Sequence, residues 1–550
     1  MSRSIETPVL IVGAGPVGLC MALDLGWRGV NGLLIEQTDG KLEYSKIGHI
    51  AVRTMEFFRR WGIARAVREA GFPDDFRMSR VICTDVKSLP LHIEEHACLR
   101  DMPVPAYSCE KKQRCPQHWL QPILQQSLAH YPSVTAKYGW ELESFEEFPD
   151  HVEARVRDLA ADEVVNVRAQ YLVACDGIAS EVRESMGIAM HGNPKLSYSI
   201  GVTARIPDML EHCHYGPAER FIFLGPEGTW GNLTTVDGRD LWRLTVLGAE
   251  NKLDLDTFDP VAWIRRGLGR SDAQVEVLHV LPWRRREMIA DRFGDGRVLL
   301  AGDSAHGMSP TGGMGMNTGV GDVVDLGWKL EALLSGWGGE ELIPSYEVER
   351  KPVAVRNAAS STSNFKVLTS PKNCAQILDK TEEGERTRRE ISAQFTEAMR
   401  ASYWEPSGIQ MGYRYEGSPI VVEDGTPPPA DQPKYVQTSR PGARAPHAWL
   451  ADGRSMLDLF GKGFVLLAFP QAEDADIDRL KAAAADCRMP LQVQRLDDKQ
   501  IAGLYEMPLV LVRPDGHVAW RGSAVDDGQR IVDLVRGASG SSRQNLKEAA

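Results

Sequence analysis

Several features that would assign this 550-residue chain to a common class are absent. Its nine cysteines are scattered and include no CxxC pair, which argues against a disulfide framework or a metal site and predicts reduced thiols in a cytoplasmic protein. Beyond an apolar stretch at 9–23, no run of about 18 apolar residues occurs, so we expect no membrane-spanning segment. The 63 basic residues do not outnumber the 75 acidic ones, which argues against nucleic acid or an anionic membrane as partner.

The overall composition is that of an ordinary globular protein. With 43% hydrophobic and 25% charged residues, the chain is neither fibrous nor largely disordered. At roughly 100–200 residues per domain, its length predicts two to four domains. No GxSxG motif is present, so the sequence offers no nucleophile elbow, and only one GxGxxG motif occurs.

The GxGxxG motif lies between two short apolar runs near the N-terminus. Residues 8–36 read PVLIVGAGPVGLCMALDLGWRGVNGLLIE, which predicts a strand, a helix and a second strand. Gly13, Gly15 and Gly18 follow the first strand directly, and Glu36 closes the second. The glycines permit a tight turn and a close approach of the backbone to a pyrophosphate at the helix N-terminus. Because an acidic residue accepts from a ribose hydroxyl, the motif predicts FAD or NAD(H) rather than NADP(H).

Two later segments repeat the pattern of a strand that ends in a polar turn. Residues 171–183 read YLVACDGIASEVR, and residues 299–319 read LLAGDSAHGMSPTGGMGMNTG. In the second, Asp303 is placed to accept from a ribityl hydroxyl. The glycine-rich loop after it directs backbone amides toward the pyrimidine edge of an isoalloxazine ring. This segment therefore favours FAD.

The three motifs, in this order, resemble those of the class A FAD-dependent aromatic hydroxylases over roughly residues 8–355. After a proline-rich stretch, the region from Arg440 onward looks like the thioredoxin-like tail of the phenol, hydroxyphenylpropionate and polyketide hydroxylase branches. The resemblance implies an α/β (α+β) fold with three parts. These are a Rossmann-like FAD-binding domain, an interleaved antiparallel-sheet substrate domain, and a thioredoxin-like domain whose lack of CxxC points to packing or homodimer formation rather than redox work.

The resemblance also implies the chemistry. NADH or NADPH would reduce FAD, O2 would add at the flavin C4a position, and the resulting hydroperoxide would hydroxylate a phenolic ring of a small aromatic substrate. A tailoring hydroxylase of a polycyclic aromatic polyketide is the first alternative, and an FAD-binding reductase or non-catalytic flavoprotein is the second. Halogenases share the fold, but their WxWxIP motif is absent.

The domain boundaries follow from the changes in pattern along the chain. Short alternating runs predict the substrate sheet, and a β-α-β-β-α pattern follows the proline-rich stretch. The predicted division is FAD-binding domain at 1–80, 103–190 and 290–400, substrate domain at 81–102 and 191–289, linker at 401–446, thioredoxin-like domain at 447–536, and flexible tail at 537–550.

The resemblance assigns a set of residues to FAD. Lys46 stands in Ser-Lys-Ile where many relatives carry Pro-Arg-Ala, and Met314 and Gly321 stand where glutamines are common, so contacts there should differ. Asp176 is expected to be structural or to act through a neighbour. The assigned residues are Gly13, Gly15, Pro16, Val17, Gly18, Glu36, Gln37, Lys46, Arg53, Gln117, Asp176, Gly302, Asp303, Pro310, Gly313, Gly315, Met316 and Asn317.

Residues for the substrate are less specific in the sequence. His49 lies on a segment that passes near the substrate end of the flavin in relatives, and an imidazole suits acceptance of a phenol proton. His306 is expected to be structural, and the run 284–286, three arginines, is expected to be a solvated face. The predicted substrate-binding residues lie in the sheet domain and are Tyr215, Arg220, Trp230 and Arg243.

Overall fold

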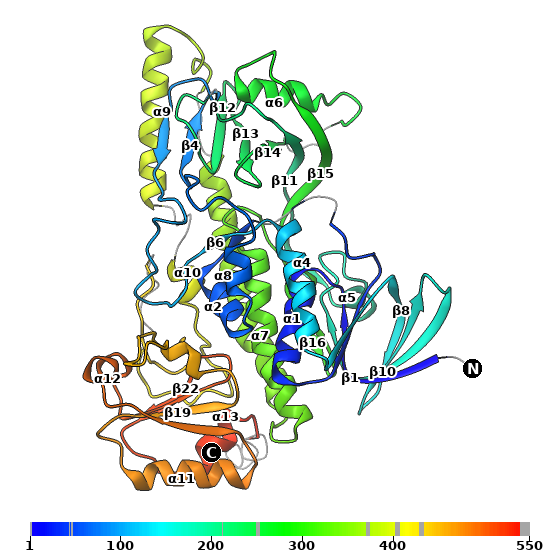
Figure 1. The fold of residues 1–550 in the computed structure, drawn as a ribbon, viewed down its shortest axis with the longest axis vertical. Helices are drawn as coiled ribbons and strands as arrows, with labels where there is room; N and C mark the ends of the chain where they lie inside the picture. The colour runs from blue at the N-terminus through cyan, green and yellow to red at the C-terminus, as the bar shows by residue number, and fades with distance from the viewer. Residues whose placement is uncertain are drawn as a thin grey trace.

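A computed structural model of the protein describes residues 3–42, 45, 48–211, 213–248, 254–369, 374–401, 407–427 and 434–538. Three large sheets organise these residues (Figure 1). The first sheet lies at the lower right of the view, the second at the top, and the third, from the C-terminal part of the chain, at the lower left. Long helices occupy the space between them.

The first sheet is mainly parallel and carries the N-terminal strand at its centre. Its order is β16-β17-β10-β1-β2-β7, and β8 and β9 extend it as an antiparallel hairpin from β10. Val9, Leu10 and Ile11 are fully buried, as expected for a parallel strand covered on both faces. The strands are β1 (Arg3–Val12), β2 (Gly32–Glu36), β7 (Val134–Tyr138), β8 (Trp140–Glu147), β9 (Val152–Asp158), β10 (Glu163–Ala174), β16 (Gly294–Asp295) and β17 (Val298–Leu300).

Helices cover this sheet and begin at its carboxyl edge. Helix α1 follows β1 directly and packs against both α4 and α7. A two-stranded ribbon of β3 (His49–Ile50) and β6 (Gln113–Arg114) lies close to the start of α7. The helices are α1 (Pro16–Arg28), α2 (Val52–Arg60), α3 (Ala64–Arg68), α4 (Gln117–Ser127), α5 (Glu181–Ser185) and α7 (Gly315–Leu334).

The second sheet is antiparallel except for one parallel pair, β12 with β4. Its order is β18-β15-β11-β14-β13-β12-β4-β5. Along β14, Trp242, Leu244 and Val246 are buried in a core with α6 (Pro260–Leu268), so Arg243 and Thr245 point to the opposite face. The strands are β4 (Arg80–Cys83), β5 (His92–Glu94), β11 (Met190–Arg205), β12 (Arg220–Gly225), β13 (Gly228–Thr235), β14 (Leu241–Leu247), β15 (Glu276–Ala290) and β18 (His306–Gly307).

Two long helices follow the return of the chain to the first sheet. Helix α8 (Leu342–Leu368) runs from the centre of the molecule toward the second sheet (Figure 1). Helix α9 (Glu382–Ala401) lies along the edge of the second sheet, where Ile391 and Phe395 pack on Ile82 of β4. The sequence-based division placed 290–400 with the first sheet, whereas α9 packs on the second.

The C-terminal unit is a four-stranded sheet of order β20-β19-β21-β22 in which only β19 and β20 are parallel. The sequence predicted one helix fewer: α12 stands between β20 and β21, and its N-cap is Asp498, whose carboxylate accepts from the amides of Gln500 and Ile501. The elements are β19 (Phe464–Ala468), α11 (Asp474–Asp486), β20 (Leu491–Arg495), α12 (Lys499–Tyr505), β21 (Leu509–Val512), β22 (Val518–Gly522) and α13 (Gly528–Val535).

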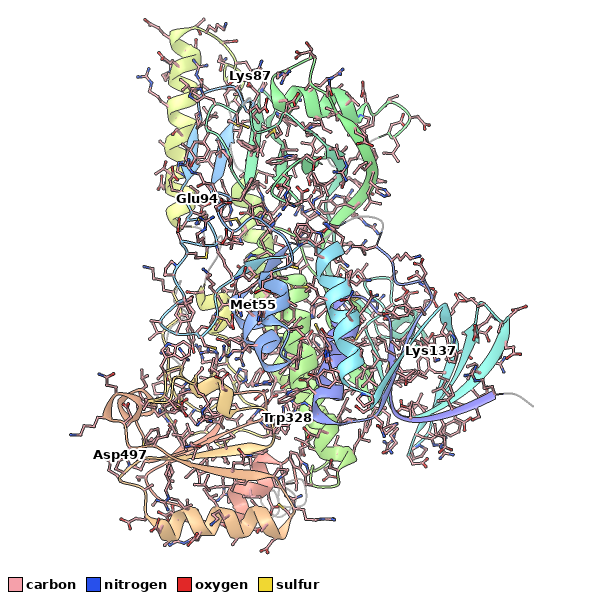
Figure 2. The ribbon with its side chains drawn as sticks, viewed as in Figure 1. Met55, Lys87, Glu94, Lys137, Trp328 and Asp497 are labelled. Carbon is pink, nitrogen blue, oxygen red and sulfur yellow. The ribbon has the colours of Figure 1, made fainter. Side chains whose placement is uncertain are left out.

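The segment expected to be a linker packs against this unit. Residues 407–427 include α10 (Ser407–Met411), and the Val422 amide donates to the carbonyl of Ala519 on β22. Trp328 of α7 lies at the junction with the C-terminal sheet (Figure 2), in a core shared with Phe464. We call the buried charged cluster at this junction the interdomain seam; it consists of Asp325, Lys329, Glu349, Arg513 and Asp515.

Candidate functional site

The three glycines of the N-terminal motif differ in what surrounds them. Gly13 has φ +98°, and a Cβ there would lie 2.6 Å from the Cys175 carbonyl oxygen. A Cβ on Gly18 would lie 1.9 Å from the Gly13 carbonyl oxygen. A Cβ on Gly15 would meet nothing within 4 Å, and no side chain caps α1 there. The first and third glycines therefore serve packing, whereas the second leaves open space beside free helix amides, which fits a bound pyrophosphate.

Glu36 stands beside these amides at the end of β2. Its Oε2 accepts from the Ala14 amide at 2.8 Å, and its Oε1 accepts from the amide and hydroxyl of Thr38. These bonds fix the carboxylate next to the helix N-terminus, where the ribose of a dinucleotide would lie. The adjacent side chain of Gln37 is exposed.

A cavity of about 430 Å³ extends from this turn toward the second sheet. Its walls come from α1, the β3–β6 ribbon, the loop at 308–316 and strands of the second sheet. Many of the predicted residues meet here: the lining includes Gly15, Pro16, Val17, His49, Gln117, Arg220, Arg243, Asp303, Pro310, Gly313, Gly315 and Met316.

Asn317 does not line the cavity but connects its walls. Its Oδ1 accepts from the Ala51 amide at 2.9 Å and from the Thr54 hydroxyl at 2.7 Å, and its Nδ2 donates to the carbonyls of Gly313 and His49. Asn317 therefore holds the glycine-rich loop against the strand that carries His49.

Three other predicted cofactor residues have different positions. Asp176 lies between two lining residues and accepts from the Val182 amide, and burial raises its pKa. Arg53 points away from the cavity: it donates to Glu56 on its own helix, α2, and to the Asp515 carbonyl of the C-terminal unit. Lys46 lies outside the residues that the structure describes.

A buried polar group supports Gly302 and Asp303 from behind. Asp322 accepts from the Gly302 amide, lies 2.7 Å from His306 Nε2, and accepts from Arg350 Nε at 2.9 Å. Burial opposes its ionisation, but His306 and Arg350 hold the pKa of Asp322 below its ordinary value. His306, Asp322 and Arg350 are almost completely buried, so His306 has the structural position that the sequence predicted.

A second cavity, of about 620 Å³, adjoins the first beneath the second sheet. The two share lining residues, including Arg220, Arg243 and Asp303. The second cavity is also lined by Gly201 and Thr203 of β11, Asn232 of β13, Thr245 of β14, and His279, Leu281, Pro282, Trp283, Arg284, Arg285 and Arg286 of β15. A molecule in this cavity would lie next to whatever occupies the first.

Arg285 is the most distinctive residue of the second cavity, and sequence reasoning missed it. It is 3% exposed, and its Nη1 donates to the hydroxyls of Ser309 (2.7 Å) and Thr311 (2.8 Å). Its guanidinium lies 4.9 Å from the ring centre of Trp283 and 4.1 Å from that of Phe365. Among the described residues no carboxylate pairs with it. Burial, with a contribution from Arg220, lowers its pKa to about 9. The expectation of a solvated face at 284–286 is therefore wrong for Arg285; strand alternation, which sends neighbours to opposite faces, was the available signal.

Positive charge dominates the lining of both cavities. Glu219 pairs with Arg114 at 2.7 Å and lies 3.8 Å from Arg80, and Asp303 is the second carboxylate. Burial and the neighbouring arginines lower the pKa of Arg243 to about 10. Against these two carboxylates, the arginines that line one or both cavities are Arg80, Arg114, Arg220, Arg243, Arg284, Arg285 and Arg286.

The structure does not bring Tyr215 or Trp230 to either cavity. Trp230 is buried on the other face of the second sheet, stacked on Phe223 at 5.0 Å and beneath the guanidinium of Arg266. Tyr215 packs at the edge of the same core, under Arg77. Both positions are those of packing residues.

Two kinds of feature are absent from the described residues. None of their helices is long and apolar enough to cross a membrane. Within the same ranges, no group of three or more His, Cys, Asp or Glu side chains has the arrangement of a metal site.

Comparisons with known proteins agree with this architecture. Residues 6–361 match the family model described as FAD binding domain, and residues 438–541 match the aromatic-ring hydroxylase C-terminal model. Aklavinone 12-hydroxylase RdmE of Streptomyces purpurascens is 30% identical over 96% of this chain and 98% of its own. The 4-methyl-5-nitrocatechol 5-monooxygenase of a Burkholderia species is 30% identical over 97% and 96%. The structure of RebC, soaked with chromopyrrolic acid and with 7-carboxy-K252c bound, has a TM-score of 0.91 at 38% identity and covers 98% of this chain and 100% of RebC.

Proposed function

Because the chain belongs to the family of FAD-binding aromatic-ring hydroxylases, we propose that it hydroxylates an extended, anionic aromatic substrate with O2 and NADH or NADPH. The family gives the FAD-dependent monooxygenase activity. The substrate class and the reductant are the proposal. One observation carries the substrate class: a 620 Å³ cavity, whose charged lining residues are mainly arginines, adjoins the flavin site.

The chain's own residues suit the binding of FAD. The Gly15 turn would hold the pyrophosphate, Glu36 the ribose, and Asp303 with the loop at 310–316 the flavin end. FAD, when bound, supplies the capacity to accept hydride and activate oxygen. The protein's tasks are to fix the aromatic ring beside it and to keep the substrate in its reactive protonation state.

The volume of the second cavity favours the polycyclic alternative over a single-ring phenol. Sites for drug-sized ligands span about 300–1,000 Å³, and 620 Å³ falls in the middle of this range. The names of two similar proteins support this choice, since one acts on aklavinone and the other was solved with a carboxylated ligand, 7-carboxy-K252c.

The charge of the cavity favours a substrate that carries a carboxylate or phenolate. Arg285 is a buried cation that no carboxylate among the described residues neutralises, and its hydrogen bonds to Ser309 and Thr311 fix its orientation. A buried, uncompensated charge is costly, and an anionic ligand that pairs with it removes that cost. Arg220 and Arg243 add to the same field.

His49 remains our candidate for the group that accepts the substrate proton. It lines the first cavity and packs against Gly313 of the glycine-rich loop. Replacement by asparagine should lower kcat and shift the pH profile of the reaction. An unchanged profile would exclude His49 from proton transfer.

The C-terminal unit supports a structural proposal only. Its β-α-β-α-β-β-α order, with β19 central, suits the predicted thioredoxin-like fold, and its buried seam with α7 and α8 suits a packing role. The homodimer and the domain boundaries stay predictions of the sequence.

The main experiment measures how much of the NADH or NADPH oxidation leads to hydroxylated product, with substrates that differ in size or in charge. The purified yellow protein is given NADH or NADPH with a simple phenol, a polycyclic aromatic carboxylic acid, or the methyl ester of that acid, and product mass is recorded beside oxygen and peroxide. We expect the acid to be hydroxylated and the ester to show a KM about 10–100-fold higher, since it lacks the charge-assisted bond. Peroxide without hydroxylated product from every substrate would favour the reductase alternative.

Substitution of Arg285 tests whether this residue recognises the carboxylate of the substrate. Arg285→Met should raise KM for the acid about 10–100-fold and leave KM for the ester nearly unchanged. Arg205→Met on β11 is the matched control, because Arg205 is half-exposed and pairs with Asp240 rather than lining the cavity. Equal loss with acid and ester would contradict carboxylate recognition by Arg285.

A further inference from the structure

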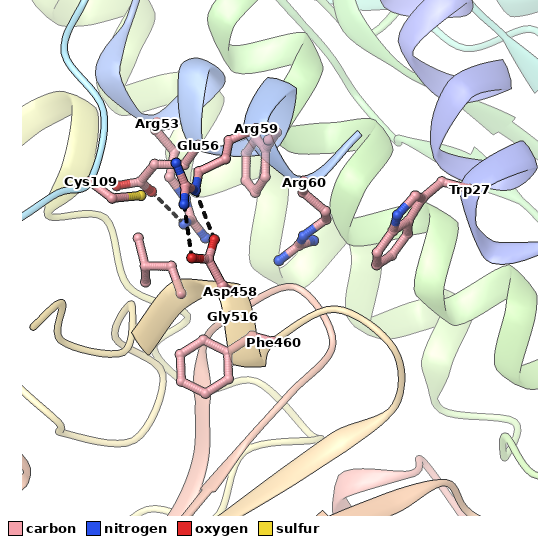
Figure 3. A pocket seen from close by; sticks show the side chains of 11 residues that line it. Trp27, Arg53, Glu56, Arg59, Arg60, Cys109, Asp458, Phe460 and Gly516 are labelled. Atoms are coloured by element: carbon pink, nitrogen blue, oxygen red, sulfur yellow. Dashed lines mark hydrogen bonds and ion pairs between the residues drawn. The ribbon is translucent and has the colours of Figure 1, made fainter. Parts of the chain in front are cut away.

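A third cavity, of about 170 Å³, lies between α2 and the C-terminal unit (Figure 3). It is separate in its lining from the two cavities of the flavin site. Figure 3 shows Arg60 reaching from α2 into the space between Trp27 and Asp458, with the Gly516 turn below. At roughly 30 Å³ per water, the space would hold a few water molecules or one small polyatomic ion.

The carboxylates at this cavity already have their partners. Glu56 accepts from Arg53, Arg444 and the Ser108 hydroxyl. Asp458 accepts two parallel bonds from Arg59. Both carboxylates, Glu56 and Asp458, are therefore already engaged with arginines other than Arg60.

Two of the arginines, in contrast, have buried nitrogen atoms without a partner. Arg53 is 6% exposed, and its Nε makes no hydrogen bond with any described residue. Arg60 makes no hydrogen bond or ion pair with the described residues, and its Nη1 is buried. Its guanidinium lies 5.8 Å from the Trp27 ring centre and 5.5 Å from that of Phe57. Burial, together with Arg28 and Arg53, lowers the pKa of Arg60 to about 10.

The arginines around Glu56 carry more positive charge than this one carboxylate neutralises. One carboxylate, Glu56, serves both Arg53 and Arg444, and Arg60 has none. A desolvated guanidinium that shares its carboxylate, as Arg53 does, or that pairs with no described carboxylate, as Arg60 does, favours an oxyanion, whose several oxygen atoms match the planar donor fork. The Gly516 turn approaches closely, and even a Cβ there would lie 3.5 Å from Arg53 Nη2.

We propose that this cavity is an anion site that binds a phosphate-class oxyanion between Arg60 and Arg53 and so joins α2 to the C-terminal unit. The source is either free inorganic phosphate or the phosphoryl group of a small metabolite. The site is independent of the substrate cavity, and its test does not use enzyme activity.

The test compares thermal unfolding of the FAD-bound protein in phosphate and in chloride at matched ionic strength. Phosphate should raise the unfolding midpoint by about 2 °C, because an ion that binds only the folded state stabilises it. Glycerol 2-phosphate is the second arm: a rise with inorganic phosphate alone indicates the free ion, and a rise with both indicates a phosphoryl group.

Arg60→Gln should abolish the phosphate effect and, in chloride, leave the midpoint equal or higher, since it removes a partly buried cation that pairs with no described carboxylate. Arg65→Gln is the control, because Arg65 is exposed on α3 and pairs with Glu69; it should retain the rise. A merely structural Arg60 would lower the midpoint in both salts alike.

A measurement on the unmodified protein covers the case in which Arg60→Gln does not fold. Cys109 lines the cavity, and phosphate should slow its alkylation by iodoacetamide several-fold. Cys98, on a loop outside this lining, is the internal control. Equal midpoints in phosphate and chloride, together with unprotected Cys109, would overturn the proposal.

Discussion

The interdomain seam and the substrate cavity both bury arginines, but the seam surrounds Arg513 with carboxylates, whereas no described carboxylate pairs with Arg285 in the cavity. In the seam, Arg513 is fully buried and contacts Glu349, Asp325 and Asp515, and Lys329 contacts two of the same acids. Burial raises the pKa of Asp325 well above its ordinary value, which favours its neutral form and brings the cluster toward a balance of charge. In the cavity, the arginines far outnumber the carboxylates.

This difference indicates that the buried charges of the seam stabilise the fold, whereas the arginines of the cavity are available to bind a ligand. A balanced buried cluster is destabilised when one member is removed, because its partners stay desolvated. An unbalanced cationic cavity loses little stability when a cation is removed, but it loses affinity for an anion. Three experiments test this contrast, beginning with the largest expected effect.

Removal of Arg513 should have the largest effect. Arg513→Met would leave buried carboxylates without their main cation, and we expect a loss of about 3–5 kcal/mol in the free energy of unfolding, measured by denaturant titration. Arg454→Met is the control; its exposed pair with Asp452 should contribute at most about 1 kcal/mol. A loss below 1 kcal/mol at Arg513 would show that the seam does not depend on balanced charge.

Acid should weaken the seam through His517. This ring is fully buried against Tyr413 and Tyr415, and burial, despite the nearby Asp515, lowers its pKa to about 4. Since the unfolded chain binds the proton from about pH 6.5 downward and the folded chain only near 4, stability present above pH 6.5 falls as the pH drops toward 4.

His517→Gln tests that assignment. The wild-type protein should lose up to about 3 kcal/mol between pH 6.5 and 4, and the variant should show a flatter profile over the same window. Parallel profiles would show that other groups cause the acid sensitivity.

We expect the smallest effect from loss of a hydrogen bond that orients Arg285. Thr311→Val removes one of its two hydroxyl partners, so KM for an acidic substrate should rise about 3–10-fold with unchanged FAD content. In a double-mutant cycle with Arg285→Met, the threonine change should add nothing. Additive effects would mean that Thr311 acts on the substrate independently of Arg285.

The flavin end of the site was predictable because its signals are local. Gly13, Gly15 and Gly18 lie within six consecutive residues, so the turn that they form can be recognised in the sequence without knowledge of the fold. The same holds for Asp303 and the glycine-rich loop, which follow their strand directly.

The substrate end was not predictable, because it depends on which side of an element faces which neighbour. Arg285 and Arg284 are adjacent and both line the second cavity, yet Arg285 is 3% exposed whereas Arg284 is exposed to solvent. Arg53 belongs to α2, which also borders the flavin region, but its position on the helix turns it toward Asp515, some 460 residues later. Trp230 and Arg243 sit on neighbouring strands and point to opposite faces.

The interleaving of the sheets also determines when the protein can acquire its flavin during synthesis. Strand β17, which carries Asp303 at its end, pairs with β10, but the chain between them builds most of the second sheet first. At about 5–20 residues per second, a ribosome needs roughly 6–25 s to deliver that intervening segment. Until then Leu172, Val173 and Ala174 of β10 lack their β17 neighbour, whereas the earlier part of the strand already pairs with β9, so the flavin-binding edge of the first sheet stays incomplete through that interval.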